Sequence, residues 1–245
     1  MDSSLNNISD LHKNFITLAN EKLKGKKTRK KAPRNIKEPL KPRYHEDNLE
    51  IIECGIDEAG RGPLFGRVYT ACVILPLKGF DHSKIKDSKR FTSKKKLLEV
   101  YEYIKENAID YSVSYNDETV IDDINIRQAT LTSMHDAIDM IGIKPDYILV
   151  DGCDFKPYKN IPHKTIEGGD NWYTPIAAAS ILAKVERDKY IEELCEEHKE
   201  LDEKYALSKN KGYGTKQHLD GIKEHGITIW HRRTFGICKK FAGLE

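Results

Sequence analysis

The stretch IIECGIDEAGRGPLFGRV, residues 51–68, contains the features that decide how the rest of this chain folds. Its first residues form a short apolar run, which predicts a β-strand. The run ends in two adjacent carboxylates, Asp57 and Glu58, and then in a turn at 59–63 that a core strand cannot continue through. We therefore expect both acids at the rim of a sheet. An ordinary strand that ends in a solvated acidic turn would read the same way, so the rest of the chain has to decide between the two.

The turn Gly60-Arg61-Gly62 has a composition suited to close contact with a ligand. Gly60 and Gly62 carry no Cβ, so the backbone there can approach another molecule closely. Arg61 offers five N–H donors in a planar group that matches a phosphate. Acids that can hold a metal thus stand beside a turn that can hold a phosphate.

Length and composition describe a chain with one sizeable core and a generously charged surface. The 245 residues suit one large domain or two small ones, and 33% of them are charged. No stretch approaches the roughly 20 apolar residues of a membrane span, and the N-terminus has no apolar secretory core. We therefore expect a cytoplasmic protein, with nuclear entry through the basic N-terminus left open. The five cysteines are scattered singly, which predicts reduced thiols and neither disulfides nor zinc ligands.

Basic charge is concentrated at the N-terminus. Residues 1–49 hold 12 Lys or Arg against 6 Asp or Glu, a net charge of +6, which leaves −4 for the remainder of a chain whose total is +2. We assign residues 1–48 to a basic, mostly disordered arm, because the run KLKGKKTRKK at 22–31 and the prolines after it have too little apolar content to fold alone. Such an arm binds nucleic acid through phosphates, serves as a nuclear import signal, or is a solvated tail.

Strands and helices alternate after the opening segment. Periodicity and turn residues predict strands at 68–75, 109–115, 147–150 and 163–166, and helices at 94–107, 124–141 and 176–188. The second strand should pair antiparallel with the first, and the later alternation predicts a mixed sheet with helices packed on it, an α/β layered domain. Asp151 follows the strand at 147–150, so it meets Asp57 at one rim if their strands are neighbours. A plain turn residue before Gly152 is the alternative for Asp151.

The predicted helix at 176–188 has small residues in its first turns, which lets it lie close to a sheet. Asp188 falls on the same face as Ala177 and Lys184, where a carboxylate needs a cation or a partner. A Lys184–Asp188 pair, four residues apart, is the simpler explanation.

The C-terminal region, about 198–245, reads as a helical appendage. Tyr213 lies there between two glycines, and it can expose its ring for stacking on a sugar or a base. The segment WHRRTF at 230–235 adds aromatic and basic residues that suit a nucleic-acid groove or simple packing equally.

Five segments taken together resemble ribonuclease HII, the type 2 ribonuclease H family. They are GIDEAGRGPLFG at 55–66, DSKRFTSKK at 87–95, INIRQAT at 124–130, LVDG at 149–152 and AAASILAKVERD at 177–188, with GYGTKQH and HRRTF as C-terminal echoes. The resemblance covers most of 50–236 in order, and it is most specific in DEAGRGP and SILAKVERD.

This resemblance implies a catalytic domain over 49–245 with a ribonuclease H-like mixed five-stranded sheet, flanking helices and a helical C-terminal region. It also implies an enzyme that hydrolyses the phosphodiester on the 5′ side of ribonucleotides in RNA–DNA hybrids or embedded in duplex DNA. The implied products are 3′-hydroxyl and 5′-phosphate ends, and the implied roles are ribonucleotide removal and replication primer removal.

The resemblance also assigns residues. By position, the four metal-binding carboxylates of the family fall on Asp57, Glu58, Asp151 and Asp188, and the implied cofactor is Mg²⁺ or Mn²⁺, with two ions during catalysis. The family's reader of the ribose 2′-hydroxyl falls on Gly60, Arg61 and Gly62, its substrate tyrosine falls on Tyr213, and Lys89 and Lys184 look like family lysines near the substrate.

The chemistry suits these residue types on its own terms. Two divalent ions roughly 3.5 to 4 Å apart can activate a water and hold the leaving oxygen of a phosphodiester. Carboxylate oxygens are hard ligands of the kind such ions prefer. Distinguishing RNA from DNA requires contact with the 2′-hydroxyl, which a backbone held close by glycines can provide.

The chain departs from the family pattern at three places. Arg67 stands where the family commonly has proline, and it either alters the turn or adds a phosphate contact. The loop at 169–175 differs from common bacterial versions. The arm at 1–48 is an addition, and it is too short and too poor in apolar residues to be the extra domain of ribonuclease HIII.

Two other functions remain open from sequence alone. A catalytically silent nucleic-acid binder would use the basic arm and Arg61, but it gains nothing from four convergent acids. A different carboxylate metallonuclease of the same fold would also cut all-DNA duplexes. We expect a monomer without membrane contact, and the sequence leaves recruitment by a replication clamp open.

Overall fold

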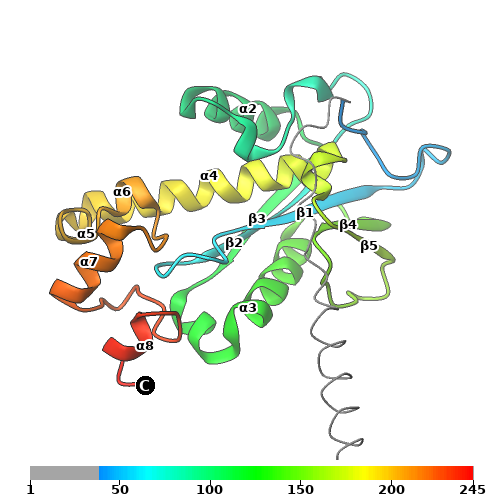
Figure 1. Cartoon of the computed structure of the whole chain (residues 1–245). Coiled ribbons are helices and arrows are strands. Elements are labelled where there is room, and N and C mark those ends of the chain that lie inside the picture. The colour runs from blue at the N-terminus through cyan, green and yellow to red at the C-terminus, as the bar shows by residue number, and fades with distance from the viewer. Residues whose placement is uncertain (1–38, 245) are drawn as a thin grey trace, which may run out of the picture. The chain divides into compact units, whose positions relative to one another are not determined.

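The computed structural model describes residues 39–244, which form a five-stranded mixed sheet with helices on both faces (Figure 1). The strands are β1 (Glu53–Ala59), β2 (Val68–Ile74), β3 (Asp110–Asn116), β4 (Tyr147–Asp151) and β5 (His163–Ile166). Their order across the sheet is β3-β2-β1-β4-β5. β1 pairs antiparallel with β2 and parallel with β4, which confirms the predicted fold class and the predicted opening hairpin.

Two long helices cover opposite faces of this sheet (Figure 1). They are α3 (Glu118–Met140) and α4 (Thr174–Glu197). The other helices are α2 (Lys94–Asn107), α5 (Lys199–Tyr205), α6 (Leu207–Asn210), α7 (Lys216–His225) and α8 (Cys238–Phe241), with short 3-10 turns η1 (His82–Lys84), η2 (Ser88–Arg90) and η3 (Gly169–Asn171). Successive strand residues point to opposite faces, so Ala71 and Val73 of β2 pack with α4 and α2, whereas Cys72 and Ile74 pack with α3. Within residues 39–244, none of the helices combines the length and apolar character that a membrane crossing needs.

α4 lies close to β1, as its small residues predict. Ala177, Ala178 and Ala179 are fully buried. A Cβ at Gly55 of β1 would lie 2.1 Å from the carbonyl carbon of Pro175, so only glycine fits at this contact. The close approach aligns α4 with the strand that carries Asp57.

α3 and α4 both extend beyond their predicted ranges. α3 begins with an unpredicted segment at Glu118, which Asp117 caps by accepting a hydrogen bond from the backbone N–H of Val120. Its backbone leaves helical geometry at Asn125, where φ is 66°, and the Asn125 side chain accepts from the N–H groups of Arg127 and Gln128, so a second segment starts close to the predicted start near 124. α4 continues to Glu197, because residues after 188 go on burying an apolar stripe in the C-terminal region.

The C-terminal helices pack onto the rest of the domain through the loop after β1, residues 60–67. Phe65 of this loop is fully buried in an apolar cluster with residues of α4 to α8. The Leu64 N–H donates to the Gly212 carbonyl at 2.8 Å, and the Arg232 N–H donates to the Leu64 carbonyl at 2.9 Å. The shape of loop 60–67 therefore depends on residues more than 140 positions away along the chain.

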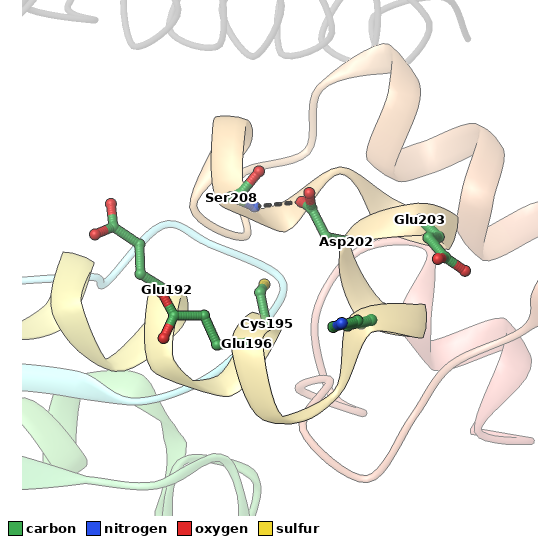
Figure 2. A pocket seen from close by; sticks show the side chains of 7 residues that line it. Glu192, Cys195, Glu196, Asp202, Glu203 and Ser208 are labelled. Carbon is green, nitrogen blue, oxygen red and sulfur yellow. Dashed lines mark hydrogen bonds between the residues drawn. The ribbon is translucent and has the colours of Figure 1, made fainter.

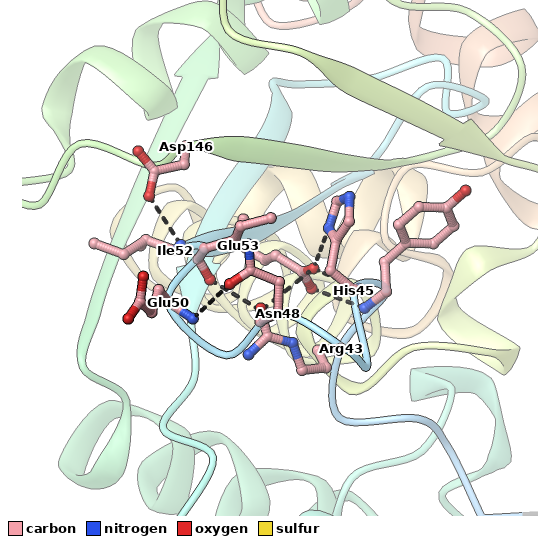
Figure 3. Close-up of polar contacts among 9 residues, drawn as sticks. Arg43, His45, Asn48, Glu50, Ile52, Glu53 and Asp146 are labelled. Atoms are coloured by element: carbon pink, nitrogen blue, oxygen red, sulfur yellow. Dashed lines mark hydrogen bonds and ion pairs between the residues drawn. The ribbon is translucent and has the colours of Figure 1, made fainter.

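Residues 39–48, which we assigned to the arm, pack against the end of β1 that lies away from Asp57 (Figure 3). The buried carboxylate of Glu53 accepts hydrogen bonds from the N–H groups of Tyr44 at 2.8 Å and His45 at 2.7 Å. Arg43 Nη2 lies 3.7 Å from the same carboxylate. The packed domain thus begins before residue 49. The assignment of a disordered arm otherwise falls on residues 1–38, which lie outside the described residues.

Candidate active site

Asp57 and Asp151 stand at the same rim of the sheet. β1 and β4 are parallel neighbours with Ile56 opposite Val150, so the acids that follow these residues emerge side by side. The strand adjacency on which we based the site is therefore confirmed. Asp57 is 5% exposed, so its carboxylate has little water to solvate it.

Asp170 joins these acids, and sequence reasoning missed it. It lies in η3, in the loop between β5 and α4, and is only 4% exposed. The backbone N–H of its neighbour Gly169 donates to Asp151 Oδ1 at 2.7 Å, which brings the loop to the rim. No strand or helical spacing in the sequence leads to Asp170, so its place in the fold reveals it.

Burial and mutual repulsion raise the pKa of every acid in this group. Burial is the largest cause for Asp57, followed by the charges of Asp151, Glu58 and Asp170, and the pKa of Asp57 lies well above its usual value. Burial and then a neighbouring acid raise the pKa of Asp151 to about 6 and the pKa of Asp170 to about 6. Burial also raises the pKa of Glu58, against the opposing effect of Arg61. Buried carboxylates that repel one another are stabilised by a cation.

Asp188 is held in a different contact from the one we expected. Its carboxylate pairs with Lys184 Nζ at 2.9 Å, which is the simpler alternative that the sequence offered. The acids whose charges raise the pKa of Asp57 are Asp151, Glu58 and Asp170. Asp170 is thus a fourth acid in this group, and the assignment of Asp188 to the metal stays a prediction.

Two buried arginines hold loop 60–67 by hydrogen bonds to its backbone carbonyls. Arg232 is fully buried and donates to five backbone carbonyls, those of Gly60, Arg61, Pro63, Gly66 and Arg67. Arg187 is 2% exposed and donates to the carbonyls of Phe65, Arg67 and Lys211. The sequence left the basic pair at 232–233 open between a nucleic-acid groove and packing, and Arg232 packs. Because the carbonyls of loop 60–67 point toward these guanidinium groups, the opposite side of the loop can contact other molecules.

The structure brings two of the predicted substrate residues to this region. Tyr213 is 51% exposed, and its ring lies beside the turn, since a Cβ at Gly62 would be 3.5 Å from Tyr213 Cε1. Lys89 Nζ lies 3.7 Å from Asp170 Oδ2, next to the acids. The side chain of Arg61 points back to Glu58, with 3.5 Å between the ion-paired atoms.

The side chain of Arg67 lies between two aromatic rings. Its guanidinium carbon lies 4.1 Å from the ring centroid of Tyr115 and 4.4 Å from that of Tyr190. A cation between two aromatic rings is attracted by both. The side chain therefore fastens the start of β2 to β3 and α4.

The donor set fits a hard divalent cation, because carboxylate oxygens are the ligands that Mg²⁺ and Mn²⁺ prefer. Within residues 39–244, however, no three carboxylate, imidazole or thiol side chains stand close enough together to hold one ion. Asp57 accepts a hydrogen bond from the Glu58 N–H at 2.7 Å, and Asp151 accepts one from the Gly169 N–H at 2.7 Å.

An acid-lined hollow of about 440 Å³ lies at the far end of α4 (Figure 2). Its lining residues are Glu192, Cys195, Glu196, Lys199, Asp202, Glu203 and Ser208. At about 1.5 Å per helical residue, Glu192 lies roughly 18 Å along α4 from Ser180, the residue that faces Asp57. The hollow is thus separate from the acids at the rim.

Comparison with known proteins finds related sequences and structures that match most of the chain. A model of the family described as ribonuclease HII matches residues 54–238. A ribonuclease HII of Bacteroides thetaiotaomicron is 45% identical over 190 residues, which are 78% of this chain and 92% of that protein. The crystal structure of the ribonuclease H2 from Pyrococcus horikoshii superposes with a TM-score of 0.65 at 24% identity, over 78% of this chain and 97% of that one. Bst-RNase HIII in complex with Mn²⁺ superposes with a TM-score of 0.53 at 18% identity, over 79% and 70% of the two chains.

Proposed function

The chain belongs to the ribonuclease HII family, and on that premise we propose that it hydrolyses the phosphodiester on the 5′ side of a ribonucleotide, in an RNA–DNA hybrid or embedded singly in duplex DNA. Membership makes the chain a ribonuclease H, a hydrolase that depends on a divalent metal. The proposed products are a 3′-hydroxyl and a 5′-phosphate. The proposed cellular roles are removal of ribonucleotides and of replication primers, in the cytoplasm.

One observation carries the proposal: acids from two strands and a loop meet at a rim beside a glycine turn and an exposed tyrosine. We propose that Asp57, Glu58, Asp151 and Asp170 hold the metal, with Asp170 in the place that the family resemblance assigned to Asp188. When bound, a pair of Mg²⁺ or Mn²⁺ ions lowers the pKa of an attacking water and stabilises charge on the phosphate. The related ribonuclease HIII structure with Mn²⁺ supports the choice of ion.

The other residues act on the sugar and on the phosphates. The backbone at Gly60, Arg61 and Gly62 contacts the ribose 2′-hydroxyl, which distinguishes RNA from DNA. Tyr213 packs against the sugar beside it. Lys89 offsets the negative charge of Asp170 and of a bound phosphate, since its Nζ is 3.7 Å from that acid. Lys184 is less available, because it is paired with Asp188.

The test is cleavage of a duplex that carries a single ribonucleotide, with and without EDTA. Asp57→Asn, Asp151→Asn and Asp170→Asn should each lower kcat by at least about a thousandfold, because each removes a charge from the site, while duplex binding survives. Asp188→Asn is the matched control on α4, and it should keep activity within about tenfold of the wild type, since it loses only a partly exposed ion pair. An inactive Asp188→Asn variant together with an active Asp170→Asn variant would restore Asp188 as the fourth metal-binding acid. Product formed in EDTA, or cutting of an all-DNA duplex, would contradict the proposed activity.

A further inference from the structure

Two histidines of the C-terminal region are completely buried and face each other. His218 lies in the first turn of α7, and His231 lies in the segment before α8. Neither has any exposed surface, and their Nε2 atoms are 3.1 Å apart. Buried polar atoms are costly unless they are hydrogen-bonded, so each ring nitrogen needs a partner. Neither histidine belongs to the acid group at the rim.

The partners of the two outer nitrogens determine where the protons lie. The Thr228 backbone N–H donates to His231 Nδ1 at 2.9 Å, so this nitrogen carries no proton. His218 Nδ1 lies 3.0 Å from the Tyr213 carbonyl oxygen, which can only accept, so this nitrogen carries a proton. A neutral His231 then holds its proton on Nε2 and donates it to the bare Nε2 of His218. One continuous chain of hydrogen bonds thus runs from Thr228 to Tyr213.

Burial keeps both imidazoles neutral. It lowers the pKa of His218, and burial followed by the charge of His218 lowers the pKa of His231 to about 3. A second proton on His218 would set two N–H groups against each other across 3.1 Å, and a second proton on His231 would set its Nδ1–H against the Thr228 N–H across 2.9 Å. The donors and acceptors of the hydrogen bonds from Thr228 to Tyr213 are therefore the same throughout the neutral pH range.

The same histidines connect Tyr213 with the loop after β1. His231 forms an antiparallel β-bridge with Phe65 of that loop, and their rings meet edge to face with centroids 5.0 Å apart. His218 holds the carbonyl of Tyr213. Because the Tyr213 ring is half exposed, neighbouring side chains fix it only in part, and its direction depends on its backbone.

We propose that the pair of His218 and His231 positions Tyr213 against Gly62, so that the ring and the turn stand at a fixed spacing for a ribonucleotide sugar. The inference rests on the proposed function, and it adds two residues that touch no substrate and act through Tyr213. The competing explanation is packing alone, in which the pair only fills the core beside Tyr205.

Two substitutions at His218 separate positioning from packing. His218→Asn keeps an amide N–H near the place of Nδ1, so it keeps the bond to the Tyr213 carbonyl and loses the contact with His231. His218→Gln reaches toward His231 but has no donor near Nδ1. Each variant loses one buried hydrogen bond, so we expect similar decreases in melting temperature.

The kinetic consequences should differ. On a duplex with a single ribonucleotide, His218→Gln should lower kcat/KM roughly tenfold and His218→Asn less than about threefold, because only the first loses the hydrogen bond from position 218 to the Tyr213 carbonyl. Adding His218→Gln to Tyr213→Ala should cause no further loss, since both changes act through one ring. Equal losses in the two His218 variants, or additive losses in the double variant, would overturn the proposal.

Amide hydrogen exchange gives a second measurement that does not need catalysis. The Thr215 N–H donates to the Tyr213 carbonyl at 2.7 Å, so a displaced Tyr213 should expose this amide. Exchange at 213–215 should be faster in His218→Gln than in His218→Asn, and equal rates in both would refute positioning. Failure of the wild type to cleave would refute the proposed function alone, because the exchange result stands without it.

Discussion

Gly60 is a residue at which backbone conformation and packing both exclude a side chain. Its φ is +95°, and an added Cβ would lie 2.2 Å from Arg187 Nε. Gly60→Ala should therefore cost about 2 to 4 kcal/mol in the free energy of unfolding and lower kcat/KM by at least about a hundredfold, because Arg187 has to move and release the loop. Denaturant unfolding and cleavage of the single-ribonucleotide duplex measure the two effects.

Gly79→Ala is the control that measures the cost of a positive φ alone. Gly79 has a φ of +78°, and an added Cβ there would meet nothing within 4 Å. We expect it to cost about 1 kcal/mol, the strain of a left-handed residue alone, with activity unchanged. Equal losses at both glycines would show that the contact with Arg187 is unimportant.

His231 should make the stability of the protein depend on pH. Its pKa is about 3 in the folded state and about 6.5 in an unfolded chain, so between these values the unfolded state binds the extra proton. Stability from this group is complete above pH 6.5 and is lost as the pH falls toward 3, by about 1.4 kcal/mol per pH unit at most. Asp151 and Asp170, whose pKa values are raised to about 6, act in the opposite direction.

The histidine contribution is therefore measured as a difference between proteins. Between pH 7 and pH 5, the wild type should lose about 2 kcal/mol more unfolding free energy than His231→Gln, because the variant cannot take up the proton. Urea unfolding at each pH gives both values. Parallel pH profiles for the two proteins would mean that His231 is not buried in its neutral form.

Individual acids show what sequence can and cannot reveal at this scale. Asp57 and Asp151 were found because each directly follows an apolar strand, and parallel pairing then brings them together. Asp170 follows no periodic pattern, and only its burial and its neighbours in space reveal it. Asp188 was assigned by position in a family motif, which says nothing about where its side chain points.

Among the elements, the segment at 39–48 behaves as part of the sheet domain. Glu53 is buried at the start of β1, and its partners come from Tyr44, His45 and Arg43. Removing residues 1–48 should cost about 3 to 5 kcal/mol in unfolding free energy, because it leaves a buried carboxylate without partners. Removing only 1–38 should cost less than about 0.5 kcal/mol.

The comparison of these two truncations also has an internal check. Glu53→Gln in the protein that lacks 1–48 should recover part of the lost stability, since it removes the unpaired charge. Thermal unfolding of the three proteins measures this. Equal stability of both truncations would mean that the contacts to Glu53 contribute nothing.

Elements with a strong apolar pattern were predictable, and those that depend on distant contacts were not. α2 starts at Lys94 as predicted, with Ser93 capping it by accepting a hydrogen bond from the Lys96 N–H, and the strands fall close to their predicted ranges. The segment of α3 before Asn125 was missed because its first turn is polar and is held by Asp117 and by Asp122, which accepts hydrogen bonds from Arg233 and Thr234. These partners are far away in sequence, so no local pattern announces them.

Across the whole molecule, the proposed active site is assembled from three distant parts of the chain. β1 and β4 supply acids at one rim of the sheet, the loop before α4 supplies Asp170, and the C-terminal region supplies Tyr213, between α6 and α7, and the support for loop 60–67. The parts meet because α4 runs from the rim into the C-terminal region, as Figure 1 shows. Mutations in either half should therefore change the same reaction.

The excess of positive charge in this chain lies in residues 1–38. Residues 1–38 hold 10 Lys or Arg against 4 Asp or Glu, a net charge of +6, whereas the remainder carries −4. We therefore expect a polyanionic substrate to be attracted mainly by these residues, through phosphates and without regard to sequence. Removing 1–38 should weaken duplex binding at low salt and leave kcat at saturating substrate unchanged.

The salt dependence tests this reasoning. Each lost phosphate contact should flatten the slope of log affinity against log salt by about 0.9, so losing five contacts changes it by about 4 to 5. A full-length variant with glutamine at Lys24, Lys26, Lys27, Lys30 and Lys31 keeps the length and removes the charge. It should match the truncated protein if charge is the cause. A slope that stays the same in both proteins would assign phosphate contact to the folded domain, where Arg61 and Lys89 stand closest to the acids.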